Sequence, residues 1–264
     1  MLRPEYETRY RNVKLSRDER GILEVTLHTD GDSLRWGIGP SHEFPQAFRE
    51  ICRDRGNRVV IIAGTGDQFI GPRADEVNMS AFVEASGGSH DASFYEREGG
   101  IAREMLQSLL EIPVPVVCAV NGPVLRHCEL ALMADIIVAS ETASFEDSAH
   151  FKLQNLVPGD GIFEIAVMLM GINRARAFVL TGDPMDADEA LRLGLVAEVL
   201  PPANVLSRAR AIASEMAAKP DVVLRYTRSM MVQPIRERLL ADLGRSMAYE
   251  ALGALAPDLE PPTM

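Results

Sequence analysis

The sequence predicts an α/β fold with a helical C-terminal region, and three observations support this prediction. Short segments rich in Val and Ile alternate with longer segments of helical periodicity, as in parallel strands joined by helical crossovers. Most of these apolar segments lack polar alternation, which is typical of a sheet covered on both faces. Beyond residue 200 the pattern is helical throughout. We therefore expect a core domain at residues 1–200 and a helical region at residues 201–264.

Four segments bounded by turn residues are predicted to form strands, at residues 22–28, 58–64, 114–120 and 135–140. The first alternates apolar and polar residues, so we expect it to be an edge strand or a half-buried one. The other three are continuously apolar. Helical spacing at residues 40–54 and 93–110 supplies crossovers long enough to join parallel strands.

The C-terminal region is predicted to contain three helices separated by Pro220 and Pro234, at residues 203–219, 221–231 and 235–255. Each has an apolar face that must be buried against the core or against another subunit. The final segment, residues 256–264, is acidic and rich in proline, and we expect it to be frayed.

Composition excludes several classes of partner. The chain has 264 residues and a formal net charge of −11, whereas nucleic acids and anionic membranes are bound by basic surfaces. Three widely spaced cysteines indicate neither a disulfide framework nor a zinc cluster. The N-terminal residues show no apolar leader, and the longest uncharged stretch, residues 112–125, contains three prolines and is too short to span a bilayer. A cytoplasmic protein that binds neither nucleic acid nor membrane is the expectation.

Common motifs for nucleotide binding and for serine hydrolysis are missing. The chain has no Gly-x-Gly-x-x-Gly after a strand, no P-loop and no Gly-x-Ser-x-Gly. Its five histidines restrict proton transfer near neutral pH to few places: positions 28, 42, 90, 127 and 150. Polar residues that follow predicted strands are therefore the candidates for a site, because ligands bind there in α/β sheets.

The first such segment spans residues 119–135, where a buried strand ends at Asn-Gly and a helix is predicted to open near Leu125. The amides of Arg126 and His127 would then lie at a helix N-terminus, which favours negative charge and can hold an oxyanion. The alternative is an ordinary turn, with Glu129 facing the helix dipole and His127 at the surface.

The second segment contains His150 and, ten positions later, Asp160, which precedes a predicted helix at residues 162–170. A carboxylate that accepts from one imidazole nitrogen fixes the tautomer and leaves the other nitrogen basic. The alternative is that Asp160 only caps its helix. The two roles are compatible.

The third segment, residues 61–75, is a strand that runs into a glycine-rich loop. Its backbone amides could supply a second oxyanion donor. The same residues also form ordinary turns.

Taken together, the three segments resemble the enoyl-CoA hydratase/isomerase, or crotonase, superfamily. The matching motifs are Ala-Gly-Thr-Gly, Ala-Val-Asn-Gly-Pro with Cys-Glu-Leu-Ala, Val-Pro-Gly, Leu-Thr-Gly and Gly-Leu-Val. The resemblance implies a spiral of ββα units with a C-terminal helical trimerisation region, assembled as a homotrimer or a dimer of trimers. It also implies an oxyanion hole made by the amides of Ala74, or its neighbour, and Arg126.

The sequence departs from the family members that act on CoA thioesters. Those proteins carry a glycine-rich run ahead of Cys-Glu-Leu, where this chain has Leu-Arg-His at residues 125–127. Glu129 aligns with one hydratase acid, but residues 146–150 contain no Glu that matches the second acid. The substitutions resemble instead the 6-oxocamphor hydrolase-like β-diketone hydrolases of the superfamily. The positions that match them are Trp36, His127, His150, Asp160 and Glu250.

This closer resemblance implies a retro-Claisen cleavage that needs neither metal nor cofactor. His150, oriented by Asp160, would activate a water that adds to one carbonyl of a β-diketone, and the C–C bond would break to give a carboxylic acid and an enolate. His127 would donate to the enolate oxygen. Glu250 would bind substrate or shuttle a proton, unless it only pairs with an arginine.

The substrate would be a small and nonpolar, cyclic β-diketone. Trp36, the only tryptophan, would line its pocket, or would simply pack in the core. We also place Glu129 among the substrate-binding residues. Two other hypotheses stay open. One is a crotonase acting on an acyl-CoA as hydratase, isomerase or thioesterase. The other is a catalytically silent trimeric binding or scaffold protein, which would have no reason to keep His150 and Asp160 within reach of each other.

Overall fold

The computed structural model describes residues 5–76 and 91–256, and a twisted six-stranded sheet is its centre. His90 and the segment 257–264 lie outside the described residues. Five neighbouring strands are parallel and the first is antiparallel, in the order β1 (Val13–Arg17), β2 (Ile22–Leu27), β3 (Val59–Ala63), β4 (Val116–Val120), β5 (Ile136–Ser140) and β8 (Glu198–Leu200). The predicted α/β fold is confirmed.

The four predicted strands are confirmed as β2, β3, β4 and β5, and the sheet has two further strands, β1 at one edge and β8 at the other. β2 is half-buried, as expected, but it is not an edge strand, because β1 pairs with its outer side. The edge strand β1 has the sequence Val-Lys-Leu-Ser-Arg, which buries only alternate residues. So short a polar alternation is a weak strand signal.

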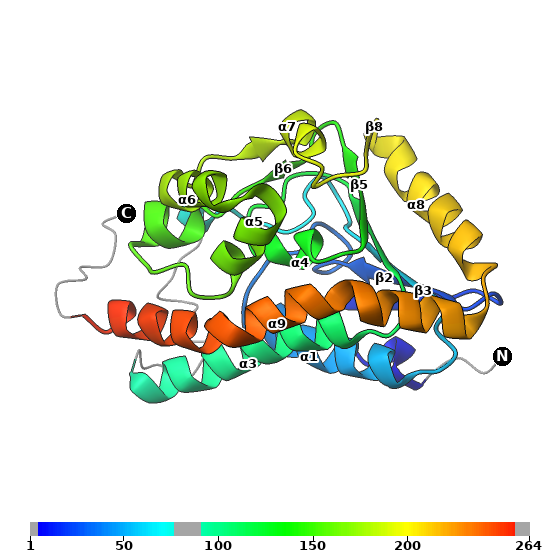
Figure 1. The fold of residues 1–264 in the computed structure, drawn as a ribbon, viewed down its shortest axis with the longest axis horizontal. Helices are drawn as coiled ribbons and strands as arrows, with labels where there is room; N and C mark the ends of the chain where they lie inside the picture. The colour runs from blue at the N-terminus through cyan, green and yellow to red at the C-terminus, as the bar shows by residue number, and fades with distance from the viewer. Residues whose placement is uncertain (1–4, 77–90, 257–264) are drawn as a thin grey trace.

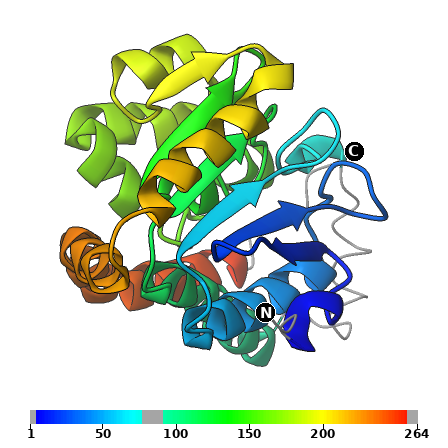
Figure 2. The same cartoon turned by 90° about the vertical axis from the view of Figure 1, so that its right-hand side faces the viewer.

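Helices cover both faces of the sheet, which explains its continuous apolar strands. On one face Val59, Ile61 and Ala63 of β3 pack with residues of helix α8 (Pro202–Ala217). On the other face, α1 (Ile38–Arg53), α3 (Ala92–Glu111) and α9 (Asp221–Ala254) form a layer of long helices beneath the sheet (Figures 1 and 2). The crossover helices predicted at residues 40–54 and 93–110 are thereby confirmed as α1 and α3.

The shorter elements form a separate group on the upper side of Figure 1. They are the two-stranded sheet of β6 (Ser144–Phe145) and β7 (Met185–Asp186), and the helices α4 (Glu129–Leu132), α5 (Ile162–Met170), α6 (Ile172–Thr181) and α7 (Ala187–Arg192). The described residues also contain short helices of other types: the 3₁₀ turns η1 (Glu5–Thr8) and η2 (Ala74–Glu76) and the π-helix η3 (Ala149–Gln154). None of the helices in the described ranges is long and apolar enough to cross a membrane.

The C-terminal region contains two helices where three were expected. Pro220 separates α8 from α9 as predicted, but Pro234 lies inside α9 and does not end it. The ring of Pro234 is on the solvent side of the helix, so water can satisfy the carbonyl that loses its backbone partner. The helix is also held by packing, since Val232 and Leu239 on its other face are buried in the main core.

One buried arginine fixes α9 to the core. Arg228 is 1 % exposed and its Nε donates to Asp135 Oδ2 at 2.7 Å, while its other nitrogens donate to the carbonyls of Leu109, Leu110 and Ile112 at the end of α3. Asp135 in turn accepts from the backbone N–H at the start of β4. The guanidinium therefore joins α9, α3 and two strands.

Candidate active site

Four segments outside the main sheet, near residues 35, 70, 124 and 145, pair with one another through single β-bridges. Isolated bridges join Arg35 with Gly71, Ile70 with Val124, and Val124 with Phe145. The backbone hydrogen bonds from Leu125 to Ile70 and from Val124 to Ser144 reinforce this arrangement. The sequence-predicted site residues Trp36, Ala74, Arg126 and His127 lie within three residues of these bridges. The pairing therefore brings three distant parts of the chain to one place.

The glycine-rich loop is held against the end of β4 by Asn121. Its side-chain amide donates to the carbonyls of Thr65, Gly66 and Gln68 at 2.9–3.4 Å. Gly122 is required at the contact, because a Cβ there would lie 1.9 Å from the carbonyl oxygen of Asp67. The Asn-Gly pair thus anchors this loop, in addition to ending the strand.

The segment around His127 is not helical where a helix was expected. The helix α4 begins at Glu129, not near Leu125, and has only four residues. Leu125 is engaged in the bridge region, and His127 has a left-handed backbone with φ of 49°. The prediction of an oxyanion site at a helix N-terminus is therefore wrong in its structural basis, because the pairing of residues 124–125 with the loop keeps this segment extended.

His127 lies among two acids and an indole. Its Nδ1 is 2.8 Å from Glu129 Oε1 and 3.4 Å from Asp160 Oδ2. The ring of Trp36 lies over it, with ring centroids 4.0 Å apart. Trp36 also packs edge-on against Phe44 of α1. The tryptophan therefore joins the core to the histidine. Its packing role is observed, and its place in a substrate pocket stays a prediction.

The polar residues around His150 suggested a loop, but His150 lies in the π-helix η3. Its Nδ1 is 2.5 Å from Asp147 Oδ1, and its Nε2 is 3.5 Å from Asp160 Oδ2. The carboxylate nearest to His150 is thus Asp147, whereas the sequence analysis expected Asp160 to orient this ring. The 3.5 Å separation is longer than a hydrogen bond.

Asp160, two residues before α5, approaches both histidines with the same oxygen atom. Its Oδ2 is the atom that approaches His127 and His150, while Oδ1 accepts a long hydrogen bond of 3.4 Å from the Ile162 amide. The capping role is consequently weak. The main position of Asp160 is between the two imidazole rings.

Glu250 reaches the cluster from α9 of the same chain. Its side chain accepts a backbone hydrogen bond from Gly159, and a Cβ on Gly159 would lie 2.7 Å from the Glu250 Cβ. Glycine therefore allows α9 to approach the segment that carries Asp160. Burial raises the pKa of Glu250 to about 7, while the charge of His150 opposes this shift.

The two histidines have opposite pKa shifts. Burial lowers the pKa of His127 to about 4, although Asp160 acts in the other direction. Burial also disfavours the charged form of His150, but Asp147 and Asp160 outweigh it and hold the pKa of His150 well above its usual value. Burial, followed by the charge of Asp160, raises the pKa of Glu129 well above the ordinary range.

Ala74 and Arg126, the residues predicted to form the oxyanion hole, belong to two segments that are joined by the bridge between Ile70 and Val124. Ala74 is buried in the turn η2, and the preceding Arg73 lies 3.4 Å from the buried Glu146. Arg126 precedes His127, and burial lowers its pKa against the effect of the nearby Asp160 and Asp147.

Three side chains of the cluster could also hold a cation. One ligand atom from each of His127, Glu129 and Asp160 lies within 4.8 Å of the others. Both carboxylates approach the same atom, His127 Nδ1, and this accounts for the spacing. The donor set alone therefore gives no reason to assign a metal.

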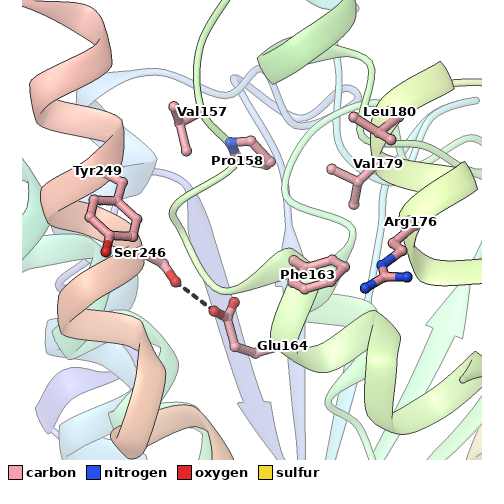
Figure 3. A pocket seen from close by; sticks show the side chains of 9 residues that line it. All are labelled: Val157, Pro158, Phe163, Glu164, Arg176, Val179, Leu180, Ser246 and Tyr249. Carbon is pink, nitrogen blue, oxygen red and sulfur yellow. Dashed lines mark hydrogen bonds between the residues drawn. The ribbon is translucent and has the colours of Figure 1, made fainter. Parts of the chain in front are cut away.

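A cavity of about 270 Å³ lies beside this cluster, between α5, α6 and α9 (Figure 3). Its lining is mostly apolar and comprises Val157, Pro158, Phe163, Glu164, Arg176, Val179, Leu180, Ser246 and Tyr249. Ser246 donates to Glu164 at 2.5 Å across its floor. Neither histidine is among the lining residues, but several lining residues are close in sequence to Asp160 or Glu250. The cavity is thus adjacent to the histidine cluster and distinct from it.

Comparison with known proteins identifies related sequences and structures. The family model described as enoyl-CoA hydratase/isomerase matches residues 18–249. A crotonyl-CoA hydratase from Syntrophomonas wolfei is 28 % identical, with 92 % of this chain and 88 % of the hydratase aligned. These relatives are similar to the chain over most of its length.

Solved structures show the same fold. A β-diketone hydrolase from the cyanobacterium Anabaena sp. PCC 7120, bound to (S)-3-oxocyclohexyl acetic acid, is 38 % identical and superposes with a TM-score of 0.90, covering 96 % of this chain and 98 % of the hydrolase. An enoyl-CoA hydratase/isomerase from Mycobacterium paratuberculosis has a TM-score of 0.81 at 23 % identity, covering 94 % and 96 % of the two chains, which is a likeness of fold.

Proposed function

Since this chain belongs to the enoyl-CoA hydratase/isomerase family, we propose that it uses the family fold to hydrolyse a C–C bond of a cyclic β-diketone. The observation that carries the proposal is the cluster of His127, Asp160 and His150, joined through one carboxylate oxygen. Similarity to the Anabaena β-diketone hydrolase supports it. The molecule bound to that hydrolase has a ketone and a carboxylic acid, which are the groups produced when water opens one ring of a bicyclic β-diketone.

His150 is proposed to activate the water. Asp147 contacts Nδ1, so the lone pair of neutral His150 is on Nε2, beside Asp160. A water that gives its proton to Nε2 adds its oxygen to one carbonyl carbon. The bond between that carbon and the central carbon then breaks, its electron pair forms the enolate of the second carbonyl, and a proton returned to the central carbon completes a carboxylic acid and a ketone.

The enolate needs a hydrogen-bond donor, because a carbon leaving group departs near neutral pH only when its charge is stabilised. His127 and the amides of Ala74 and Arg126 are proposed to provide it. The tilted contact of Trp36 with His127 restricts the imidazole ring, and the indole is proposed to offer an apolar wall to a ring-shaped substrate. Glu250, whose pKa of about 7 allows it to gain or lose a proton, is proposed to carry the proton to or from the cluster.

Turnover in ¹⁸O-labelled water tests the proposal. Bicyclic and monocyclic β-diketones would be incubated with the protein, and loss of diketone and formation of acid would be followed by NMR and mass spectrometry. We expect one ¹⁸O atom in the carboxyl group, and a rate reduced at least about 10²-fold by His150→Ala. Turnover unaffected by this substitution would contradict the mechanism.

An acyl-CoA substrate is the second candidate, because the curated relatives include a crotonyl-CoA hydratase. A two-acid hydration would need a second acid at the matching position within residues 146–150. The carboxylate that does lie beside Glu129, that of Asp160, comes from a different segment and approaches both histidines. In this chain Glu129 contacts His127, and the place of the second acid is taken by residues 146–150, which present His150. Stabilisation of the protein by acyl-CoA in a thermal-shift series, together with hydration of crotonyl-CoA, would favour this candidate over the diketone.

A trimer or a dimer of trimers is proposed as the assembly. Helix α9 exposes large apolar side chains that are costly to leave in water: Val222, Val223, Tyr226, Met230, Met231, Leu240, Tyr249 and Leu252. Burying such a face against a second copy is the usual solution. Light scattering coupled to size exclusion tests this assembly, and a monomer at micromolar concentration would exclude it.

A further inference from the structure

Asp147 holds the nitrogen of His150 that faces away from Asp160. Its Oδ1 lies 2.5 Å from Nδ1, and its side chain is nine-tenths buried. A carboxylate can only accept, so Nδ1 must carry the hydrogen. We infer that Asp147 is the positioning residue that fixes the reactive tautomer of His150. The tautomer itself follows from the contact, and only the reaction that it serves rests on the proposed function.

The fold gives Asp147 no other hydrogen-bond partner among the described residues. Its second oxygen, Oδ2, is buried without a hydrogen bond, so no arginine or backbone amide donates to it, and Arg126 acts on Asp147 through its charge alone. A buried carboxylate without a partner is costly, and the contact with His150 is what offsets this cost. The carboxylate of Asp147 therefore has its one hydrogen bond among the described residues with His150.

The segment that carries Asp147 is fixed on both sides. Before it, Phe145 is fully buried in β6 and the Glu146 amide donates to Val124 at 3.3 Å. The Glu146 side chain accepts from Ser148 at 2.5 Å. After it, the π-helix η3 begins at Ala149 and sets His150 three residues beyond Asp147. Both partners of the contact are thus held by the backbone and need little ordering.

Asp147 and Asp160 act on different nitrogens, and this separates their effects. Besides Asp147, the groups that face His150 electrostatically are Asp160 ahead of α5, Glu250 from α9, Glu129 from α4 and the neighbouring His127. Removing the charge of either aspartate is expected to make His150 easier to deprotonate. Only Asp147, at 2.5 Å, also decides which nitrogen keeps the hydrogen.

The test is ¹⁵N NMR of the full-length protein with labelled histidine, and His150→Gln assigns the His150 signals. In the parent, neutral His150 should be the Nδ1–H tautomer, with a titration midpoint above that of free histidine. Asp147→Asn should lower the midpoint by about one pH unit or more and populate the other tautomer, because an amide can also donate. Asp160→Asn should lower the midpoint and keep the Nδ1–H tautomer.

The matched control is Asp183→Asn. Asp183 is exposed and pairs with Lys152 on the same π-helix, so it tests a general change in η3 without touching His150. Its spectrum should equal that of the parent. An Nε2–H tautomer in the parent, or an Asp147→Asn spectrum like that of the control, would overturn the inference.

Kinetics with a β-diketone form the second arm. Asp147→Asn should lower kcat by about 10²–10⁴-fold with little change in KM, and should move the acid limb of kcat/KM to lower pH. A purely structural role would lower stability without moving that limb. If the parent turns over no β-diketone, the proposed function fails, while the NMR arm still decides the role of Asp147.

Discussion

His127 and His150 lie against the same carboxylate oxygen, yet their surroundings favour opposite charges. Asp160 Oδ2 is 3.4 Å from one ring and 3.5 Å from the other. Both rings are buried, and the difference comes from each ring's second acid together with the charge of Arg126, which lowers the pKa of His127. His150 has Asp147 at 2.5 Å, whereas His127 has Glu129, whose raised pKa favours the uncharged form. A shared carboxylate can therefore support two histidines of different charge when only one has a further anion.

This difference separates the roles of the rings. A neutral His127 beside a charged His150 is the arrangement expected of the resting protein at neutral pH. His150 must lose its proton before it can accept one from water. The raised pKa makes unprotonated His150 a strong base, but it also keeps most His150 protonated at neutral pH. Activity should therefore depend on pH.

Replacing the shared carboxylate should have the largest effect. Asp160→Asn removes the charge next to both rings while it keeps the shape of the side chain. We expect kcat/KM for a β-diketone to fall by about 10²–10⁴-fold, because His150 loses basicity and His127 loses its contact. Steady-state kinetics measure this fall. A variant within threefold of the parent would show that the shared oxygen is not used.

The pH profile should be the next largest effect. The pKa of His150 is raised, so the basic, unprotonated form is scarce below that pKa and becomes dominant above it. We therefore expect kcat/KM to rise with pH, about tenfold per unit on the acid side, and to level off above neutrality. A profile that is flat from pH 5 to 8 would contradict this assignment of the base.

Glu129→Gln should change activity less than either aspartate substitution does. Because Glu129 favours its neutral form, replacing it with an amide removes little charge and keeps a hydrogen-bonding group 2.8 Å from His127. We expect a fall in kcat/KM of less than about tenfold. A loss comparable to that of Asp160→Asn would show that Glu129 is charged, and the contrast between the rings would disappear.

The smallest expected effect concerns stability. The pKa of His127 is about 4 in the folded protein and near 6.5 when the chain is unfolded, so the unfolded chain binds a proton first as pH falls. Stability linked to His127 is therefore complete above about pH 6.5 and is lost between about pH 6.5 and 4. His127→Gln should reduce this acid-side loss by about 1–3 kcal/mol in urea unfolding. An unchanged slope would contradict the shift.

The sheet could be predicted because burial on both faces produces apolar strands that local sequence reveals. Val59–Ala63 and Val116–Val120 are apolar at every position and buried at every position. Pro234 misled the prediction, because the sequence does not show that its side of α9 faces water. Whether proline ends a helix depends on what lies around the freed carbonyl.

The site could be predicted in part. His127, His150 and Asp160 were identified through motif resemblance, and the structure brings them together. Asp147 was missed because an acid three residues before a histidine is common, and its direction depends on the π-helix that follows. The extended backbone at residues 124–125, followed by the left-handed His127, was missed for a related reason, since it results from pairing with a loop distant in sequence.

The long helix α9 has a consequence for the order of events during synthesis. Arg228 fixes one part of this helix beneath the sheet, and Glu250 from another part lies beside His150 and Asp160. Domains of a growing chain fold in the order in which they emerge. A nascent or truncated chain that ends before α9 would therefore lack Glu250, and it would also lack the apolar face of α9 and the Arg228 partner of Asp135, so both the core and the set of proton-transfer groups would be incomplete.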